Sequence, residues 1–379
     1  MLMKVCYLGT YDADYVRNRV IIAGLRSQGV EVVECHAALW RGTDDKVWAT
    51  RQGLLNPGLW WRVLRAYGRL LRLYRRVGRY DVLVVGYAGH MDMFLARLLT
   101  WLRRKPLVFD VFLSWHETVV HDRQLLRPHS LLAALLYGVE KVACLLADRL
   151  LLDTEAHISY FMAKYGLSRE RFRCIRVGAE EDLFTPVPAE PAQEPFTVTY
   201  FGKFIPLHGM EHVIRAAGAL QGDAGIRFDL IGGGQTYDEM RALARALRIE
   251  NITWGPGWLD PVALHRRIGR ADVFLGIFGA SPKALRVIPT KAYVALAMGK
   301  PLVTSDSAAA REVLTAGENA LLVAPGDPQA IAAAILALKR DPTLRQRIAQ
   351  GGRHLYLSQL STHHIGAQAK RVLEELVSR

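Results

Sequence analysis

The sequence predicts an α/β protein made of two doubly wound domains, each with a parallel sheet covered by helices on both faces. Apolar, strand-like runs alternate with helical patterns twice along the 379 residues. A proline-rich stretch without periodicity, PVPAEPAQEP at 186–195, separates the two series. The chain is also too long for one ordinary hydrophobic core. These observations together indicate two domains joined by a linker.

The first series predicts an N-terminal domain over residues 1–185, followed by the linker 186–195. Its strand-like runs are nearly continuous in apolar residues, which is typical of parallel strands that are buried on both faces. They lie at 3–10, 30–37, 81–87, 106–112, 148–154 and 172–178.

The second series predicts another domain over residues 196–360. Its strand-like runs lie at 196–203, 226–234, 251–257, 271–278, 301–306 and 320–326. Helices are expected at 237–247 and at 328–339, the latter with Asp327 as its N-cap. We expect the segment 361–379 to form a final helix that packs back on the domain junction. Ligands of such sheets bind beyond the carboxyl ends of the strands, so we expect the two domains to face each other across a cleft.

Composition and charge narrow the class of protein. The share of apolar residues is 51% and that of charged residues 22%, as in soluble globular proteins. The four cysteines are scattered and form no C-x-x-C pair, which favours a reducing cytoplasm over a disulfide framework or a metal site. The N-terminal MLMKVCYLGT looks like a strand rather than a secretory signal. The longest apolar run, 130–147, is interrupted by Glu140 and Lys141, so we expect no spanning helix.

Three segments of the second domain have the features of a phosphate site. FGKFIPLHG at 201–209 leaves a strand with a glycine and a lysine, and opens the next helix at His208. IGGGQ at 231–235 is a second glycine-rich strand end, where the backbone can approach a ligand closely. In RVIPTKAYVALAMGKPLV at 286–303, Pro289 and Thr290 begin a helix whose free N–H groups suit a phosphate. Each segment alone is also compatible with an ordinary turn.

The order of these segments resembles the second domain of glycosyltransferase family 4. The resemblance covers residues 196–350, and its strongest part is AMGKPLVTSD followed by GENALLVAPGDP. The resemblance implies the GT-B fold and the transfer of a sugar from a nucleotide diphosphate sugar with retention of configuration. It implies that the donor is a substrate and that no cofactor is needed. The N-terminal half resembles this family only in its alternation of strands and helices.

The resemblance also implies roles for donor-binding residues. Lys203, after Gly202, stands where the family has a cation for the donor diphosphate. His208 stands where the family usually has a second cation, and Gly233 belongs to the second glycine-rich loop. The family usually carries two glutamates, for the donor sugar and the ribose, at the positions of Arg286 and Val294. With both carboxylates missing, Arg286 and Lys291 favour the diphosphate instead. These cations could replace a metal ion, and we expect no metal site.

Strand ends of the N-terminal domain supply candidates for the acceptor site. Asp110 ends the run PLVFDVF, and His116 follows in SWHE. Either side chain could act on the acceptor hydroxyl or stabilise positive charge on the sugar, although a cap or a solvated loop explains them as well. Family members often have a histidine nearer the position of Phe112. Other polar groups expected at the same edge are Thr10, Tyr11, His90 and Asp153.

The net charge of +13 is concentrated in one region. Residues 51–105 contain 12 lysines and arginines against 2 acids. Arginines recur at helical spacing beside an apolar stripe of Leu64, Tyr67, Leu71 and Tyr74. The basic stripe and the two aromatic residues at its start are Trp60, Trp61, Arg62, Arg65, Arg69, Arg72 and Arg76. A basic amphipathic helix of this kind suits an anionic membrane surface, whereas a helix packed on the sheet with solvated arginines is the main alternative. Nucleic acid is a weaker interpretation, because no recognition motif accompanies the charge.

The sequence therefore predicts a retaining glycosyltransferase at the cytoplasmic face of the cell membrane. Its partners would be a nucleotide sugar, a lipid-linked or other amphipathic acceptor, and the anionic membrane surface. Two alternatives stay open. One is a degenerate, non-catalytic protein of the same fold that binds or scaffolds a partner, which the two missing glutamates favour. The other is a sugar-nucleotide epimerase, which has no use for a basic helix.

Overall fold

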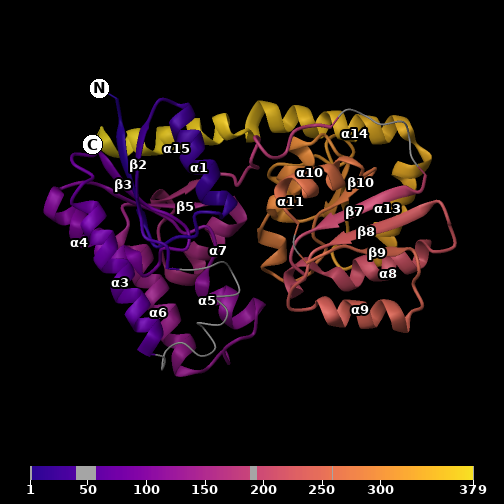
Figure 1. The fold of residues 1–379 in the computed structure, drawn as a ribbon, viewed down its shortest axis with the longest axis horizontal. Coiled ribbons are helices and arrows are strands. Elements are labelled where there is room, and N and C mark those ends of the chain that lie inside the picture. The colour runs from indigo at the N-terminus through magenta and orange to yellow at the C-terminus, as the bar shows by residue number, and fades with distance from the viewer. Residues whose placement is uncertain (1, 40–56, 188–193, 258, 379) are drawn as a thin grey trace. The chain divides into compact units, whose positions relative to one another are not determined.

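The computed structural model describes residues 2–39, 57–187, 194–257 and 259–378, which form two compact units. Unit 1 comprises residues 1–177 and 362–379, and unit 2 comprises residues 178–361. Figure 1 shows a parallel sheet with helices packed around it in each unit. This is the GT-B architecture expected from the sequence, and each unit is described here by itself.

The sheet of unit 1 has six parallel strands in the described residues, in the order β2-β1-β3-β4-β5-β6. The pairing of β1 with both β2 and β3 places the change of winding direction at β1. All six strands fall within the runs expected from the sequence. They are β1 Lys4–Gly9, β2 Glu31–His36, β3 Val82–Val85, β4 Leu107–Asp110, β5 Arg149–Leu152 and β6 Phe172–Cys174.

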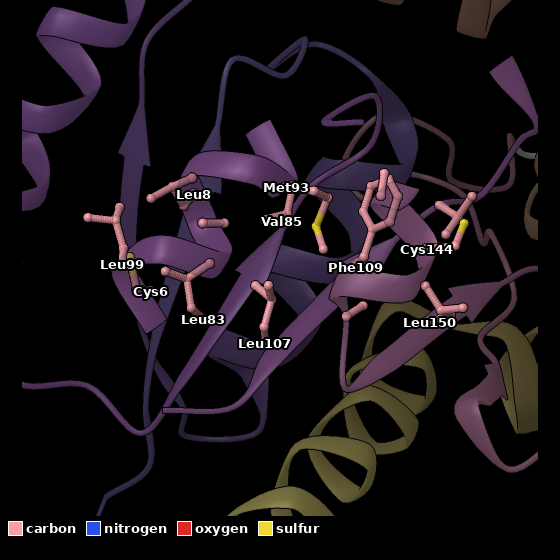
Figure 2. Packing of buried hydrophobic residues seen from close by; sticks show 14 of the residues in the cluster. Cys6, Leu8, Leu83, Val85, Met93, Leu99, Leu107, Phe109, Cys144 and Leu150 are labelled. Atoms are coloured by element: carbon pink, nitrogen blue, oxygen red, sulfur yellow. The ribbon is translucent and has the colours of Figure 1, made fainter. Parts of the chain in front are cut away.

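The helices of unit 1 cover both faces of this sheet. One face packs against α3 Pro57–Tyr74, α4 Asp92–Arg103, α6 Leu131–Leu146 and α7 Glu155–Tyr165. Figure 2 shows this core, where Leu8, Val85, Leu107 and Phe109 of the strands meet Met93 of α4 and Cys144 of α6. The other face packs against α1 Val16–Ser27 and α15 Thr362–Val377. A short helix, α5 Trp115–Glu117, follows β4.

The final helix completes unit 1, although unit 2 lies between them in the sequence. In Figure 1 the yellow α15 runs along the indigo α1. The two helices cross at a pair of glycines, where a Cβ on Gly366 would lie 2.0 Å from the carbonyl oxygen of Gly24. Ile365 and Leu373 of α15 are buried in the same core as Val20 and Ile21 of α1. A larger side chain at the crossing would separate the helices.

Unit 2 has a second sheet of six parallel strands in its described part, in the order β12-β11-β10-β7-β8-β9. The strands are β7 Phe196–Phe201, β8 Ile226–Ile231, β9 Ile252–Trp254, β10 Val273–Leu275, β11 Leu302–Ser305 and β12 Leu321–Val323. The helices are α8 Met210–Leu220, α9 Tyr237–Ala246, α10 Pro261–Gly269, α11 Thr290–Ala297, α12 Ala308–Arg311, α13 Pro328–Arg340 and α14 Pro342–Leu355. The carboxylate of Asp327 caps α13, as expected, by accepting from the amides of Gln329 and Ala330.

The first boundary between the units differs from the expected linker. Unit 2 already begins at Gly178, so residues 178–185 leave the domain to which the sequence had assigned them. The hydroxyl of Tyr356 donates to the carbonyl oxygen of Ala179 at 3.2 Å and to Glu181 Oε1 at 3.1 Å. Phe184 stacks near Phe201 of β7, with 6.4 Å between the ring centroids. These contacts hold the segment on unit 2. Residues 188–193 of the expected linker lie outside the described residues.

Candidate functional site

The two glycine-rich loops of unit 2 lie against each other at the carboxyl ends of β7 and β8. The amide of Gly202 donates to the carbonyl oxygen of Ile231 at 2.9 Å, and the amide of Phe204 donates to that of Gly233 at 2.9 Å. A Cβ on Gly232 would lie 2.0 Å from the carbonyl oxygen of Gly202. Gly202 and Gly232 also share a φ of +136°, which other residues rarely adopt. The glycines are therefore required by this close packing of two loops.

A buried polar cluster lies beneath the first loop. Lys291, on the first turn of α11, places its Nζ 3.7 Å from the ring centroid of Tyr200. A Cβ on Gly202 would lie 2.9 Å from the same Nζ, so the loop passes directly over the amine. The side chain of Lys291 is 4% exposed, and burial lowers its pKa well below the ordinary value. The structure thus brings Gly202 and Lys291 together, as expected for one anion site.

His208 belongs to the same cluster. Its Nδ1 lies 2.5 Å from the carbonyl oxygen of Lys203, 2.7 Å from the hydroxyl of Tyr200 and 3.4 Å from Nζ of Lys291. Burial raises the pKa of Tyr200 well above the ordinary value, so its hydroxyl stays protonated. Lys203 itself is exposed on the loop. The backbone carbonyl of Lys203, the ring of His208 and the amine of Lys291 are therefore neighbours in the fold.

The helix α11 begins at Thr290, with Pro289 as its N-cap residue. Pro289 has no side-chain group to accept a hydrogen bond, so the N-cap residue itself does not cap the first amides of this helix. The two positions without glutamate differ in their surroundings. Val294 is 1% exposed and packs in the core, while Arg286 ends a short 3-10 turn and is half-buried. Donor-binding roles for Gly233, Arg286, Pro289, Thr290 and Val294 remain predictions.

Asp110, the predicted catalytic carboxylate of unit 1, is fully buried and paired. It receives hydrogen bonds from Arg17 Nη2 at 2.8 Å and from Arg17 Nε at 3.0 Å. Arg17, also fully buried, donates to the carbonyl oxygens of Ile175 and Arg176 as well. Burial raises the pKa of Asp110, and the guanidinium opposes this rise. This geometry favours a structural ion pair that ties α1 to β4, and the catalytic role of Asp110 stays a prediction.

A second buried carboxylate, Glu140 of α6, organises the loop around His116. Glu140 accepts hydrogen bonds from the backbone amides of Trp115 and His116 at 2.7 and 3.0 Å, and from the hydroxyl of Tyr165 at 2.5 Å. Burial would raise the pKa of Glu140, but the neighbouring His90, Lys164 and Tyr165 outweigh burial and lower it to about 2. Glu140 is therefore ionised and fixes the backbone on which His116 stands.

His116 is held neutral by the same cluster. Lys164 Nζ lies 3.1 Å from its Nδ1 and donates to Ser114 Oγ at 3.0 Å. Burial, together with the charge of Lys164, lowers the pKa of His116 to about 4. An ammonium can only donate, so Nδ1 of His116 is the acceptor and its proton is on Nε2. At neutral pH, His116 is thus a hydrogen-bond donor through Nε2 rather than a base.

The four predicted acceptor-binding residues each have a partner within unit 1. The backbone amide of Thr10 donates to Asp92 at 2.7 Å, and the hydroxyl of Tyr11 donates to Glu34 at 3.1 Å. His90 Nε2 lies 3.4 Å from Glu140 Oε1, and Asp153 Oδ1 lies 2.9 Å from His157 Nδ1. These side chains lie at strand ends as expected, but they form separate clusters. Their role in acceptor binding remains a prediction.

The basic helix α3 packs on the sheet through only one member of the expected apolar stripe, Tyr74, together with other residues. Its buried residues are Leu59, Ala66, Leu70 and Tyr74. Tyr67, half-buried, directs its hydroxyl to Asp92. Leu64 and Leu71 instead stay exposed at 65% and 38%, beside the exposed arginines Arg65, Arg69 and Arg72. The apolar stripe is thus corrected: two of its members face solvent with Trp60 and Trp61, and Arg62 turns inward to donate to the carbonyl oxygen of Leu39 at 2.7 Å.

Among the described residues, no group of three or more His, Cys, Asp or Glu side chains could hold a metal ion. In the same part of the chain, no helix has the length and apolar character needed to cross a bilayer.

Sequence reasoning missed the partners that hold the candidate residues. Arg17 and Lys164 gave no local signal, because each meets its partner far along the chain. Tyr200 lies in the apolar run of strand β7, where nothing in the sequence indicates a contact with Lys291 or His208. Glu140 did give a signal, because a single carboxylate in the apolar helix 131–146 requires partners. From the sequence, Glu140 served only as evidence against a membrane span.

Part of the chain resembles a known protein family and several curated relatives. Residues 185–355 match the family model described as "Glycosyl transferases group 1". The chain is 24% identical over 231 residues to the MMP alpha-(1->4)-mannosyltransferase of Mycolicibacterium hassiacum, covering 61% of this chain and 54% of that protein. It is 28% identical over 175 residues to the lipopolysaccharide core biosynthesis glycosyltransferase LpsE of Rhizobium meliloti, covering 46% of this chain and 48% of that one. The chain thus spans about half the length of these curated relatives.

Solved structures resemble the whole chain. Sucrose-phosphate synthase from Thermosynechococcus elongatus has a TM-score of 0.73 and 18% identity, over 100% of both chains. HepE of Anabaena, in complex with UDP, has a TM-score of 0.70 and 16% identity, over 99% of this chain and 100% of that one. At such identities the likeness concerns the fold. The chain has the GT-B fold, and its second unit, with the clustered glycines and cations, is the part that matches the glycosyltransferase group 1 model.

Proposed function

We propose that the protein is a glycosyltransferase that takes a sugar from a nucleotide diphosphate sugar, with retention of configuration and without a metal ion. The observation that carries this proposal is the cluster of Gly202, Lys203, His208 and Lys291 at the carboxyl edge of the second sheet. This cluster lies within the segment that matches the group 1 model. The complexes of HepE with UDP and with UDP-glucose support a uridine nucleotide as the first donor to test.

The cluster suits the leaving diphosphate. Transfer breaks the bond between the anomeric carbon and the diphosphate, so negative charge grows on the departing oxygen. The exposed Lys203 on the loop, the buried amine of Lys291 beneath it and the start of α11, where Pro289 offers no capping side chain, supply a cation, an amine and amide donors at one edge. Such preorganised donors stabilise developing charge without a metal ion. The resemblance to family 4, which implies retention, rests on the motifs of this same domain.

The acceptor is proposed to be lipid-linked or otherwise amphipathic, at the inner face of the cell membrane. Support comes from α3, where exposed tryptophans and leucines lie among exposed arginines. Two further helices on the same face of the sheet add large exposed apolar residues. They are Phe94, Leu98, Trp101 and Leu102 on α4, and Leu131, Leu132 and Leu135 on α6. Apolar side chains interspersed with arginine suit the interface of an anionic bilayer.

A binding screen followed by a turnover assay tests the donor half of this proposal. UDP-, GDP-, ADP- and TDP-sugars are added separately, and the melting temperature is recorded. A ligand that binds the folded state raises the melting temperature in proportion to ln(1 + [L]/Kd). The donor that binds is then incubated with the protein, and release of nucleotide is measured. Slow release shows an enzyme, and the absence of binding by all four classes would overturn the proposal.

Sedimentation with liposomes tests the membrane half. We expect the protein to pellet with anionic vesicles at low salt and much less with neutral ones, because each arginine near the surface adds about 1 kcal/mol. The variant Arg65→Gln/Arg69→Gln/Arg72→Gln removes three exposed charges of α3 and should stay in the supernatant. A matched triple variant of exposed arginines in unit 2, Arg215→Gln/Arg227→Gln/Arg245→Gln, should still pellet. Equal sedimentation of the wild type with both vesicles would contradict a membrane role.

A second candidate is a non-catalytic protein of the same fold. The observation that favours it is Val294, which is buried where the family usually has a glutamate and offers no group for a ribose hydroxyl. Under this candidate the donor binds and no nucleotide is released, with or without acceptor. The turnover assay above therefore separates the two functions.

A further inference from the structure

Lys291 is a buried amine in the second unit. Its Nζ contacts the face of Tyr200 and lies near Nδ1 of His208, and within the described residues it makes no ion pair with a carboxylate. A lysine that is 96% buried normally has a paired charge, because an isolated ammonium in a protein interior is costly. The usual resolution is loss of the proton, and burial does lower the pKa of Lys291 well below its ordinary value.

The neighbouring histidine cannot supply the missing partner. His208 Nδ1 lies 2.5 Å from the carbonyl oxygen of Lys203, and a carbonyl oxygen can only accept a hydrogen bond. The proton of His208 is therefore on Nδ1, which leaves Nδ1 without a lone pair for the ammonium of Lys291. The hydroxyl of Tyr200 is likewise directed to the carbonyl oxygen of Lys203 at 3.0 Å. Two charged residues of the nearby loop and turn, Lys203 and Arg286, are cations as well.

We propose that the diphosphate of the donor enters this site together with one proton, which Lys291 takes up from solvent. The inference rests on the proposed function, since it requires an anion at the loop of Gly202. The loop passes within contact distance of the amine, so a phosphate cradled there would face Lys291 across a single layer of backbone. An anion at that distance stabilises the charged amine and restores the proton that burial removes.

Proton uptake makes donor binding depend on pH in a defined direction. In the free protein the pKa of Lys291 is lowered by burial, and in the complex the anion raises it again. Between these two values binding consumes a proton, so the affinity falls as the pH rises, by up to about tenfold per pH unit. Below the lower value Lys291 is already charged, and the affinity no longer changes through this group.

Calorimetry of UDP binding tests the coupling directly. Titrations are run from about pH 7.5 to about pH 9.5, in two buffers with different ionisation enthalpies at each pH. This range lies above the second pKa of a phosphate group, which is about 6. The dependence of the observed enthalpy on the buffer gives the number of protons taken up. For the wild type we expect this number to approach one within the range, with a matching loss of affinity as the pH rises.

Three variants identify the group that takes up the proton. Lys291→Met should abolish proton uptake. Lys203→Met, which removes the exposed lysine of the loop, should weaken binding and leave proton uptake unchanged. His208→Gln should also retain it, because Nδ1 of this histidine already donates its proton to the carbonyl oxygen of Lys203. Binding of UDP without proton uptake anywhere in the range, or uptake that persists in Lys291→Met, would overturn the inference while leaving the donor site intact. Failure of UDP, GDP, ADP and TDP alike to bind would instead overturn the proposed function.

Discussion

Buried ionisable side chains have different kinds of partner in the two units. In unit 1 two buried carboxylates are already paired with cations or amides, since Asp110 pairs with Arg17, and Glu140 accepts from the amides of Trp115 and His116 and lies near Lys164. In unit 2 the buried Lys291 has no carboxylate partner among the described residues. The paired carboxylates of unit 1 hold the fold together, whereas a buried amine without a carboxylate partner can take up a proton when an anion binds nearby, as proposed above. Four predictions test this contrast.

The largest effect is expected from breaking the ion pair of unit 1. Arg17→Met leaves Asp110 buried without its counter-ion, which should destabilise unit 1 by about 3–5 kcal/mol. Amide hydrogen exchange in β1 and β4 would report this loss, with amides of β7 in unit 2 as the internal control. The double variant Arg17→Met/Asp110→Leu should recover much of the stability, because it removes both charges. A loss below about 1 kcal/mol in the single variant would show that this pair is not structural.

Acid should weaken unit 1 in two steps. The pKa of His116 is lowered to about 4 from 6.5, so the unfolded chain binds this proton first and stability falls as the pH drops from 6.5 to 4. The pKa of Glu140 is lowered to about 2 from 4.5, so its stabilisation is present above pH 4.5 and is lost toward pH 2. The Glu140 step is worth on the order of 3 kcal/mol.

Urea unfolding at a series of pH values measures both steps. His116→Phe should flatten the upper step and leave the lower one, whereas Glu140→Gln should remove the lower step at a cost in stability at neutral pH. Nitrogen-15 NMR of His116 gives an independent check, since Nδ1 should be the unprotonated nitrogen at neutral pH. A normal titration of His116 near pH 6.5 would contradict the hydrogen bond from Lys164.

A smaller effect is expected at the exposed cation of unit 2. Lys203→Ala should reduce the affinity for UDP by about 1.5–3 kcal/mol, as for a hydrogen bond to a charged group. Lys203→Arg keeps the charge and should lose much less. The measurement is the dissociation constant by calorimetry at fixed pH and salt. An affinity in Lys203→Ala equal to that of the wild type would remove this lysine from the site.

The smallest effect is expected for the folded state without ligand. Lys291→Met removes a buried amine that has no carboxylate partner, so the free energy of unfolding should stay within about 1 kcal/mol of the wild type or rise. Thermal unfolding without and with UDP measures this. The wild type should be stabilised by UDP, and the variant much less. A large destabilisation of the unliganded variant would mean that Lys291 has a structural partner, as Arg17 does.

The same contrast explains what could be predicted from the sequence. Strands such as 82–85 lie in short, continuous apolar runs, which are typical of parallel strands buried on both faces. These runs alternate with helical patterns, so the fold could be predicted. The candidates of unit 2 come from loops at one edge of one sheet, so Gly202, Lys203 and Lys291 could be expected to meet. Asp110 could not be interpreted in the same way, because Arg17 lies 93 residues earlier. The spacing of residues along the sequence does not predict such a long-range pair.

Two other misses have local physical causes. On α3, leucines occur at helical spacing on more than one side, so the sequence did not distinguish the core side, with Leu59 and Leu70, from the exposed side, with Leu64 and Leu71. The boundary of unit 2 was expected in the proline-rich stretch, because composition changes there. The structure places it at Gly178, since the hydroxyl of Tyr356 reaches back to Ala179. The responsible residue lies 177 positions away, where composition carries no information about it.

The place of α15 in unit 1 has a consequence for biosynthesis. A ribosome makes all of unit 2 before it makes Thr362–Val377, the helix that covers Val20 and Ile21. During that interval the nascent first unit exposes one apolar face of its sheet, while unit 2 already has its complete sequence. Unit 2 can therefore mature first, although it comes second in the chain. A nascent chain that stalls before Thr362 would carry a finished unit 2 together with a first unit whose apolar face still needs a chaperone.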